Sequence, residues 1–369
     1  MTESPYRLYA WPLSYYSGKV RAYLRHKGLP FRECSPRAWD MHRIKRHVGA
    51  AAMPVLVTPQ GDWLLDSSHI IDVLEARHPQ VSVLPESPIQ RLAAGLLEVW
   101  GDEFWLPAAL HFRWHYSENE REQFLPEAGD ALLPGAPRWL KNLAAGRAVS
   151  MLRGYLPGLG VTVEQAETLE GWTDAMLDVL EDHFAHHRYL LGDRPCLGDF
   201  GLLGPLYAHL GRDPWPRREL MGPRPQLYAW VQRMHDPAAA ISSARGFLPH
   251  DVLPTTLAPL FESIFGEMLP WLAQLRRQVS VADPPAPGRG YPRQLEPVRL
   301  SLGGHAFVRN ATPFSLWKLQ RVLDGRNKMS PAQRSLGDAW LNAQGGLDAV
   351  DDLAVAPRLK RLGLHVAPA

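Results

Sequence analysis

Two short motifs early in the chain could together bind the head group of an amino acid. Met53-Pro54 begins an apolar run, and Asp66-Ser67-Ser68 follows twelve residues after the proline. A cis Met53–Pro54 bond would leave the backbone of Met53 free to pair with a peptide-like ligand. A helix starting at Ser67 would offer free amide hydrogens to a carboxylate, and Asp66 could accept the ammonium group. The simpler alternative is that Pro54 only begins a strand and that Asp66 or Ser67 only caps a helix.

A second group of side chains could line a cleft for a small molecule. Aromatic and titratable residues gather in one helical stretch: Trp100, Asp102, Glu103, Trp105, His111, Trp114 and His115. His111 and His115 have the spacing of two metal ligands on one helix face, but no third ligand is evident nearby, so we expect no metal. Asp102 and Glu103 point about 100° apart on a helix, which favours caps or ion pairs over a shared catalytic site. We expect His183, His186 and His187 to be solvated.

The front of the chain reads as a β-α-β-α-β-β-α unit. Strands are predicted at 6–10, 31–34, 54–58 and 63–65, and helices from Ser17 to Lys27, over 38–48 and over 70–77. Ser17 is the expected N-cap of the first helix, and Asp66-Ser67-Ser68 supplies the N-cap of the third. Both helices should therefore begin close to residues that could contact a ligand.

The middle of the chain is predicted to be almost entirely helical. Three prolines and no periodicity mark residues 79–88 as a linker, and the helical part runs from 89 to 236. The clearest helix spans 162–189 and opens with a Thr162-Val-Glu-Gln165 capping box. Prolines between 117 and 160 predict short helices there.

The last part of the chain has a different character. We expect a helix over 256–279, a Pro/Gly-rich arm over 283–290 and a β-hairpin whose strands, 298–302 and 305–309, flank Gly303-Gly304. Short helices at 314–324 and 331–343 are predicted to end the chain. Because an isolated hairpin is marginal in water, this one must pack on the protein or on a partner.

Composition narrows the class of protein. The chain has 369 residues, enough for two domains and an appendage, and 40 basic residues against 38 acidic ones. This balance gives no overall field for a nucleic acid, and no apolar run is long enough for a membrane span. Only Cys34 and Cys196 are present, which excludes a disulfide framework and suits a reducing cytosol. We expect a cytoplasmic protein.

In three ordered motifs the sequence resembles the cytosolic glutathione transferase superfamily. They are Ser14-Tyr-Tyr-Ser17-Gly-Lys-Val-Arg21, Met53-Pro54-Val-Leu56 and Asp66-Ser67-Ser68-His-Ile70. The resemblance covers about 6–236 and includes Cys196-Leu-Gly-Asp199-Phe200, which looks like the family's capping box with a cysteine replacing serine or threonine. It implies a thioredoxin-like domain over 1–79, an all-helical substrate domain over 89–236, and an added extension over 237–369.

The resemblance also implies roles for particular residues. Glutathione would be the cosubstrate, held by Met53, Pro54, Asp66 and Ser67. Ser14 matches the position of the catalytic serine or cysteine and would stabilise the glutathione thiolate, with Tyr15, Tyr16 and Ser17 as alternative donors. Ala52 replaces a long polar residue common in relatives, which removes one contact to the tripeptide. The basic helix with Arg43, Lys45, Arg46 and His47 is either a further contact or a solvated face.

We therefore expect a glutathione transferase-like enzyme that conjugates, reduces or isomerises a small hydrophobic electrophile, and we expect a homodimer as in the family. The alternative from another class is a noncatalytic protein of the same fold, which binds or scaffolds partners through its C-terminal extension. Fold alone does not choose between them.

Overall fold

The front of the chain forms a four-stranded sheet in the order β2-β1-β3-β4. The structure is a computed structural model that describes residues 5–236, 246–355 and 357–369. The strands are β1 (Tyr6–Tyr9), β2 (Phe31–Cys34), β3 (Val55–Val57) and β4 (Trp63–Leu65). β1 pairs parallel to β2 and antiparallel to β3, and β3 pairs antiparallel to β4. This is the predicted thioredoxin-like arrangement.

Three helices complete this part: α1 (Tyr15–His26), α2 (Ala38–Val48) and α3 (Ser67–Arg77). The predicted N-cap of the first helix is wrong. Ser14 is extended and its Oγ accepts a hydrogen bond from the backbone of Ser17 at 3.4 Å, so the helix begins three residues earlier than expected. Ser17 lies inside the first turn and is buried. The prediction that Asp66 begins α3 is confirmed.

The middle of the chain is helical, as predicted. Its longer helices are α4 (Pro88–Val99), α5 (Leu106–His115), α6 (Leu125–Leu132), α7 (Arg138–Arg153), α8 (Ala166–His186), α9 (Leu197–Pro205) and α11 (Pro225–His235). Shorter π-helical and helical segments lie between them: η1 (Trp100–Phe104), η2 (Asn119–Phe124), η5 (Leu206–Leu210), α10 (Pro214–Pro216) and η6 (Arg217–Met221).

Two details of this helical part differ from expectation. α7 has 16 residues, because the prolines predicted to shorten the helices lie outside 138–153. The Thr162 side chain makes no capping hydrogen bond, so a 3-10 turn, η4 (Val163–Gln165), precedes α8. The helix begins at Ala166 and ends before Tyr189.

The described residues divide into two compact units, each built from separate stretches of the chain. Unit 1 comprises Met1–Ser82, Ala108–Leu156 and Leu202–Ala244. Unit 2 comprises Val83–Pro107, Pro157–Gly201 and Arg245–Ala369. These units group residues that lie close together in space, and they do not test where one domain of the chain ends and the next begins. The domain limits at 79, 89 and 236 therefore stay predictions.

The C-terminal extension contains more structure than predicted. It begins with α13 (Ala258–Ser263), η8 (Ile264–Met268) and α14 (Leu269–Val281), followed by the hairpin β5 (Pro297–Leu302) and β6 (His305–Asn310) and by α15 (Pro313–Asn327) and α16 (Pro331–Ala343). The expectation that the chain ends after two short helices is wrong. A further helix, α17 (Leu347–Ala354), and a second hairpin, β7 (Leu359–Leu362) and β8 (His365–Pro368), follow them.

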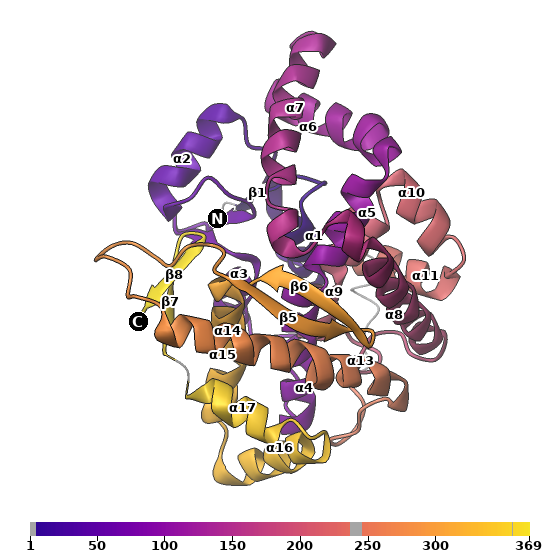
Figure 1. Cartoon of the computed structure of the whole chain (residues 1–369), viewed down its shortest axis with the longest axis vertical. Helices are drawn as coiled ribbons and strands as arrows, with labels where there is room; N and C mark the ends of the chain where they lie inside the picture. Colours follow the sequence, from indigo (N-terminus) through magenta and orange to yellow (C-terminus); the bar gives the residue numbers. More distant parts are fainter. Residues whose placement is uncertain (1–4, 237–245, 356) are drawn as a thin grey trace. The chain divides into compact units, whose positions relative to one another are not determined.

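The first hairpin packs on its own unit. Val298, Leu300, Leu302 and Phe307 are buried on one face of the strands, and β5 contacts α14, η8 and α8. The Gln274 side chain of α14 donates to the backbone oxygen of Arg299 at 2.7 Å. The apolar face of the hairpin is therefore covered within unit 2 (Figure 1).

Buried charges join α15 to α4 and η1 inside unit 2. Lys318 Nζ lies 3.1 Å from Asp102 Oδ2, and both side chains are almost fully buried. Arg321 pairs with Glu98 at 2.9 Å, and Ser315 Oγ donates to Glu103 at 2.5 Å. Since a buried carboxylate needs a partner, the extension is a structural part of this unit.

We predict that Lys318→Met lowers the free energy of unfolding by about 3–5 kcal/mol, because it leaves Asp102 buried without its cation. The double variant Asp102→Leu with Lys318→Met should recover most of this loss. Denaturant unfolding measures both values. Lys328→Met, at the exposed end of the same helix, is the matched control and should change stability by less than about 0.5 kcal/mol. Equal losses in the single and double variants would contradict the expected pairing.

Candidate functional site

The strand register brings three chain segments to one end of the sheet. Tyr9 of β1 pairs with Val55 of β3, and Val55 pairs with Leu65 of β4. The segment that leads from Tyr9 to Ser14 therefore begins next to Met53 and Pro54, the two residues before Val55. Asp66, which follows Leu65, lies next to Met53 and Pro54 on the opposite side. Tyr9, Val55 and Leu65 thus form one row across the sheet. All the predicted site residues lie on the segments that enter or leave this row, namely Ser14, Met53, Pro54, Asp66 and Ser67.

The side-chain hydroxyl of Ser14 lies at the start of α1. It is half-buried, and its Oγ caps the helix through the N–H of Ser17. Tyr15 is buried against His209, with ring centroids 5.4 Å apart, and Tyr16 packs on Tyr15 at 4.7 Å. Ser17 Oγ is buried and makes no hydrogen bond within the described residues. Among the four candidate donors, Ser14 alone combines partial exposure with the N-cap position.

The start of α3 is capped by the side chain of Asp66. Asp66 has φ 77°, and its Oδ1 accepts from the N–H groups of Ser68 and His69, each at 3.0 Å. Ser67 is buried, and its Oγ makes no hydrogen bond to any residue that the structure describes. Because an unpaired buried hydroxyl is costly, Ser67 is suited to bind a ligand at the positive end of the helix dipole.

One residue near these motifs was missed by the sequence analysis. Lys19 of α1 is fully buried and its Nζ donates to Ser68 Oγ of α3 at 3.1 Å. This bond ties the first turns of the two helices together. A lysine inside an otherwise apolar helix face is the signal that could have revealed it.

The Met53–Pro54 peptide bond is cis, as predicted. Pro54 is buried, and Met53 and Ala52 are half-buried next to it. The basic side chains of α2 divide into two kinds. His47 stacks on Trp63 with centroids 4.1 Å apart and Arg43 lies over the same ring, whereas Lys45 and Arg46 are exposed.

A cavity of about 750 Å³ lies in unit 1 at the carboxyl ends of β1 and β2. Its walls come from three regions: Arg7, Tyr9 and Trp11–Leu13; Arg32–Ser35, Arg37 and Asp40; and Glu127, Asp130, Ala131 and Pro134. None of the five predicted site residues lines it, but Leu13 immediately precedes Ser14. The sequence analysis did not predict this cavity, because strands β1 and β2 and helix α6 are distant in the sequence.

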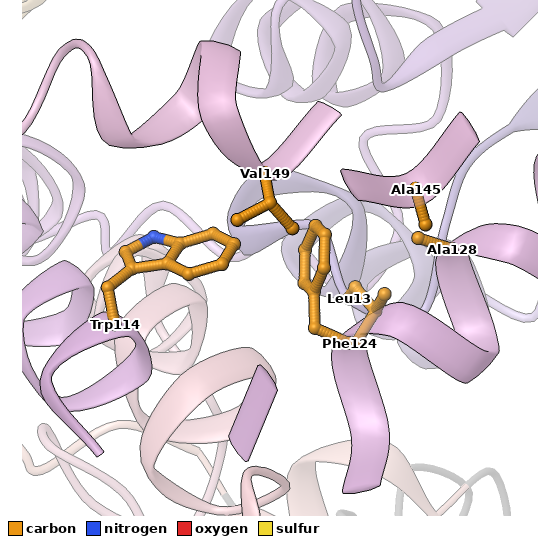
Figure 2. Packing of buried hydrophobic residues seen from close by; sticks show 6 residues of the cluster. All are labelled: Leu13, Trp114, Phe124, Ala128, Ala145 and Val149. Carbon is orange, nitrogen blue, oxygen red and sulfur yellow. The ribbon is translucent and has the colours of Figure 1, made fainter. Parts of the chain in front are cut away.

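Leu13 is fixed by packing and by one buried arginine. Its side chain belongs to an apolar cluster with residues of α5, η2, α6 and α7, which are Trp114, Phe124, Ala128, Ala145 and Val149 (Figure 2). The Arg113 guanidinium donates to the backbone oxygen of Leu13 at 2.7 Å and pairs with Asp213 at 2.7 Å. The loop before Ser14 is therefore held in place.

The aromatic and titratable stretch from 100 to 115 is mostly core and does not line this cavity, so the expected cleft wall is wrong for most of its members. Trp100 and Trp105 are fully buried and pack on Trp172, and Trp114 belongs to the cluster of Figure 2. Asp102 and Glu103 bind residues of α15, which confirms an ion-pair role for Asp102.

Among the histidines, His186 is exposed as expected, whereas His183 differs from expectation. His111 is buried while His115 is exposed, and no group of metal ligands occurs among the described residues. His183, expected to be solvated, is buried and hydrogen-bonded to Thr256 at 2.8 Å. Burial lowers the pKa of His183 to about 3, so its imidazole is neutral and serves the core.

Asp199 caps the helix α9 as expected. Its Oδ2 accepts from the N–H of Cys196 at 2.9 Å and its Oδ1 from that of Leu190 at 3.1 Å. Burial raises the pKa of the Cys196 thiol well above its usual range. Cys196 is therefore an inert core residue, and Asp199 provides the cap.

These observations define a protein with a thioredoxin-like front part and a helical remainder. Models of the glutathione S-transferase N-terminal and C-terminal domains match residues 8–82 and 173–233. Residues 8–82 and 173–233 therefore match the two domains of the glutathione transferase superfamily. No described helix is both long and apolar enough to cross a membrane.

Several known proteins are similar to this chain. A maleylacetoacetate isomerase of Pseudomonas aeruginosa is 26% identical in an alignment of 222 residues that covers 57% of this chain and 86% of that protein. A glutathione S-transferase of Methylobacterium radiotolerans, solved with glutathione sulfonate, is 24% identical and has a TM-score of 0.40. The match covers 68% of this chain and 100% of the chain of that transferase. A beta-etherase of a Sphingobium species is 20% identical with a TM-score of 0.46, covering 65% and 98%.

We predict a pH dependence of stability from Glu103. Burial raises the pKa of this carboxyl to about 7, above its usual 4.5, although Lys318 and Ser315 oppose the shift. The folded protein therefore keeps a proton that the unfolded chain loses, and stability should fall by roughly 2–3 kcal/mol as pH rises from 4.5 to 7. Glu103→Gln should flatten this fall in denaturant titrations. Glu262→Gln, an exposed control, should leave it unchanged, and an identical slope in Glu103→Gln would contradict the assignment.

Proposed function

We propose that the protein is a glutathione-dependent enzyme that activates the glutathione thiol for reaction with a small electrophile. The observation that carries this proposal is the row Tyr9–Val55–Leu65, which brings the segments of Ser14, Met53-Pro54 and Asp66-Ser67 to one end of the sheet. The match to the two family domains supports it, and so do the glutathione ligands of similar solved proteins.

Each residue has a separate task in this proposal. The backbone of Met53, beside Pro54, pairs with the tripeptide, as in β-strand addition. Asp66 accepts the γ-glutamyl ammonium group, while the hydroxyl and the backbone N–H of Ser67 donate to the α-carboxylate of the same γ-glutamyl residue, because the N–H groups of Ser68 and His69 are already bonded to Asp66. Ser14 Oγ donates to the sulfur.

The chemistry requires Ser14 because a free thiol, with a pKa near 8.5, is mostly protonated at pH 7. A hydroxyl donor at the positive end of α1 stabilises the thiolate, which is the attacking species. The thiolate then conjugates, reduces or isomerises the electrophile. Isomerisation is the reaction in the name of the Pseudomonas aeruginosa relative.

The electrophile is proposed to bind in the cavity of unit 1, since Leu13 lines it and Ser14 is the next residue. The apolar part of the cavity wall includes Tyr9, Trp11 and Leu13. The noncatalytic alternative gains no specific support, because the apolar face of its proposed docking hairpin is covered by α14, η8 and α8. A homodimer in the cytoplasm stays a prediction, which sedimentation and fractionation would check.

The first test is glutathione binding and its dependence on Ser14. Ser14→Ala should raise the pKa of the bound thiol toward 8.5, because the thiolate loses its donor. We expect kcat/KM at pH 6.5 to fall roughly tenfold to hundredfold, with glutathione affinity nearly unchanged. Thiolate absorbance against pH and calorimetry measure the two quantities. Ser17→Ala is the matched control. A chain that neither binds glutathione at millimolar levels nor is stabilised by it would refute the function.

A second test separates the charge of Asp66 from its role as a helix cap. Asn also caps helices well, so Asp66→Asn should retain α3 while removing the partner of the ammonium group. We expect glutathione to bind about tenfold or more weakly, with a melting temperature close to that of the parent. Calorimetry with glutathione and with a des-amino analogue measures the effect. Equal weakening for both ligands would show that Asp66 does not contact the ammonium group.

A further inference from the structure

Two arginines lie side by side in the wall of the unit 1 cavity. Arg7 of β1 and Arg32 of β2 are register partners in the parallel pair, and both side chains are exposed and line the cavity. Neither makes an ion pair or hydrogen bond with any residue that the structure describes. Like charges at paired positions of neighbouring strands repel each other. An anion between them would remove this repulsion.

The carboxylates of the same wall are already engaged and do not neutralise these arginines. Glu33 binds Arg21 at 2.7 Å, Glu127 binds Arg212 at 2.8 Å, and Asp130 binds Lys141 at 2.7 Å. Asp40 accepts from the backbone N–H of Arg37 at 3.0 Å and so caps α2.

A third arginine adds to the positive charge of the wall. Arg37 also lines the cavity, and its guanidinium lies over Trp39 without a carboxylate partner in the described chain. The free groups of this wall are therefore hydrogen-bond donors with positive charge. A ligand that matches them supplies acceptors and negative charge.

Apart from Cys34 and Ser35, the rest of the cavity wall is mainly apolar. Tyr9, Pro12, Leu13 and Pro134 line it together with the half-buried Trp11. Arg7 and Arg32 precede Tyr9 and Cys34 by two residues, which places them roughly 7 Å back from the strand ends. A ligand that spans this cavity has an anionic group at one end and a flat apolar body toward Leu13.

We propose that this cavity binds a carboxylic acid with a planar aromatic or conjugated body, and that Arg7 and Arg32 bind its carboxylate. The inference rests on the proposed function in one respect: the acid is the electrophile that meets glutathione next to Ser14. It narrows the second substrate from any small hydrophobic electrophile to an anionic one. The guanidinium pair binds the carboxylate through N–H donors, and no covalent step is involved.

The experiment compares one acid with its neutral ester. Calorimetry on the full chain without glutathione measures 3,5-dinitrobenzoate and methyl 3,5-dinitrobenzoate, which differ in charge and share the same ring. We expect the benzoate to bind at least about tenfold more tightly than the ester. Arg7→Gln and Arg32→Gln should each weaken the benzoate about tenfold and leave the ester within about twofold. Arg147→Gln, an exposed arginine of α7 in the same unit, is the matched control and should change neither.

Three results would overturn the inference. They are an ester that binds as tightly as the benzoate, arginine variants that keep the benzoate affinity, and inorganic phosphate that binds as tightly as the benzoate. Glutathione titrated into the same variants separates this site from the tripeptide site. We expect its affinity to stay unchanged, and variants that lose glutathione while keeping benzoate would also overturn the assignment. Arginine-dependent benzoate binding in a chain that does not bind glutathione would support the anion site and refute the proposed function.

Discussion

The candidate site depends on the pairing of three short strands. Tyr9, Val55 and Leu65 occupy one row, so the ends of β1 and β4 and the start of β3 meet at the same edge. Val55, Leu56 and Val57 are all buried, so β3 packs on both of its faces, and a shift of one residue would exchange the side chains packed on the two faces. The core therefore fixes the register, and the register fixes where Ser14, Met53-Pro54 and Asp66 lie. Function at this edge follows from apolar packing several residues away.

The extension depends on a different constraint, which is the need of buried carboxylates for partners. Asp102, Glu103 and Glu98 lie on the inner side of α4 and η1, and α15 supplies Lys318, Ser315 and Arg321. A relative without the extension could not keep these three acids buried at the same cost. The close approach of α16 to α4 has a steric cause instead, because a Cβ at Gly337 would lie 2.7 Å from Leu92 of α4. The added segment thus completes unit 2.

The sequence predicted local structure well and spatial grouping poorly. The strands 31–34 and 63–65 and the helices 38–48 and 331–343 have the predicted limits, since each is bounded by turn residues or caps. The last hairpin was missed because Lys360 and Arg361 hide the alternation of its strands. Trp100, Trp105 and Glu103 were expected in a cleft because their types suit one. Trp100 and Trp105 pack on Trp172, and Glu103 is bound by Ser315 of α15, which lies some 200 residues later in the chain; no local pattern reports such contacts.

The same limit applies to the cavity arginines. In the sequence, Arg7 and Arg32 are ordinary polar residues on alternating strands, and only the parallel pairing of β1 and β2 makes them neighbours. Their pairing has a chemical consequence next to a thiolate. In the proposed complex a nearby thiolate repels the carboxylate, which weakens binding of the charged substrate when the nucleophile is ionised. Two guanidinium groups in contact with the carboxylate more than offset that repulsion. If the protein has the function and the anion site that we propose, the arginine pair would allow an anionic electrophile and an ionised sulfur to occupy adjoining sites at the same time.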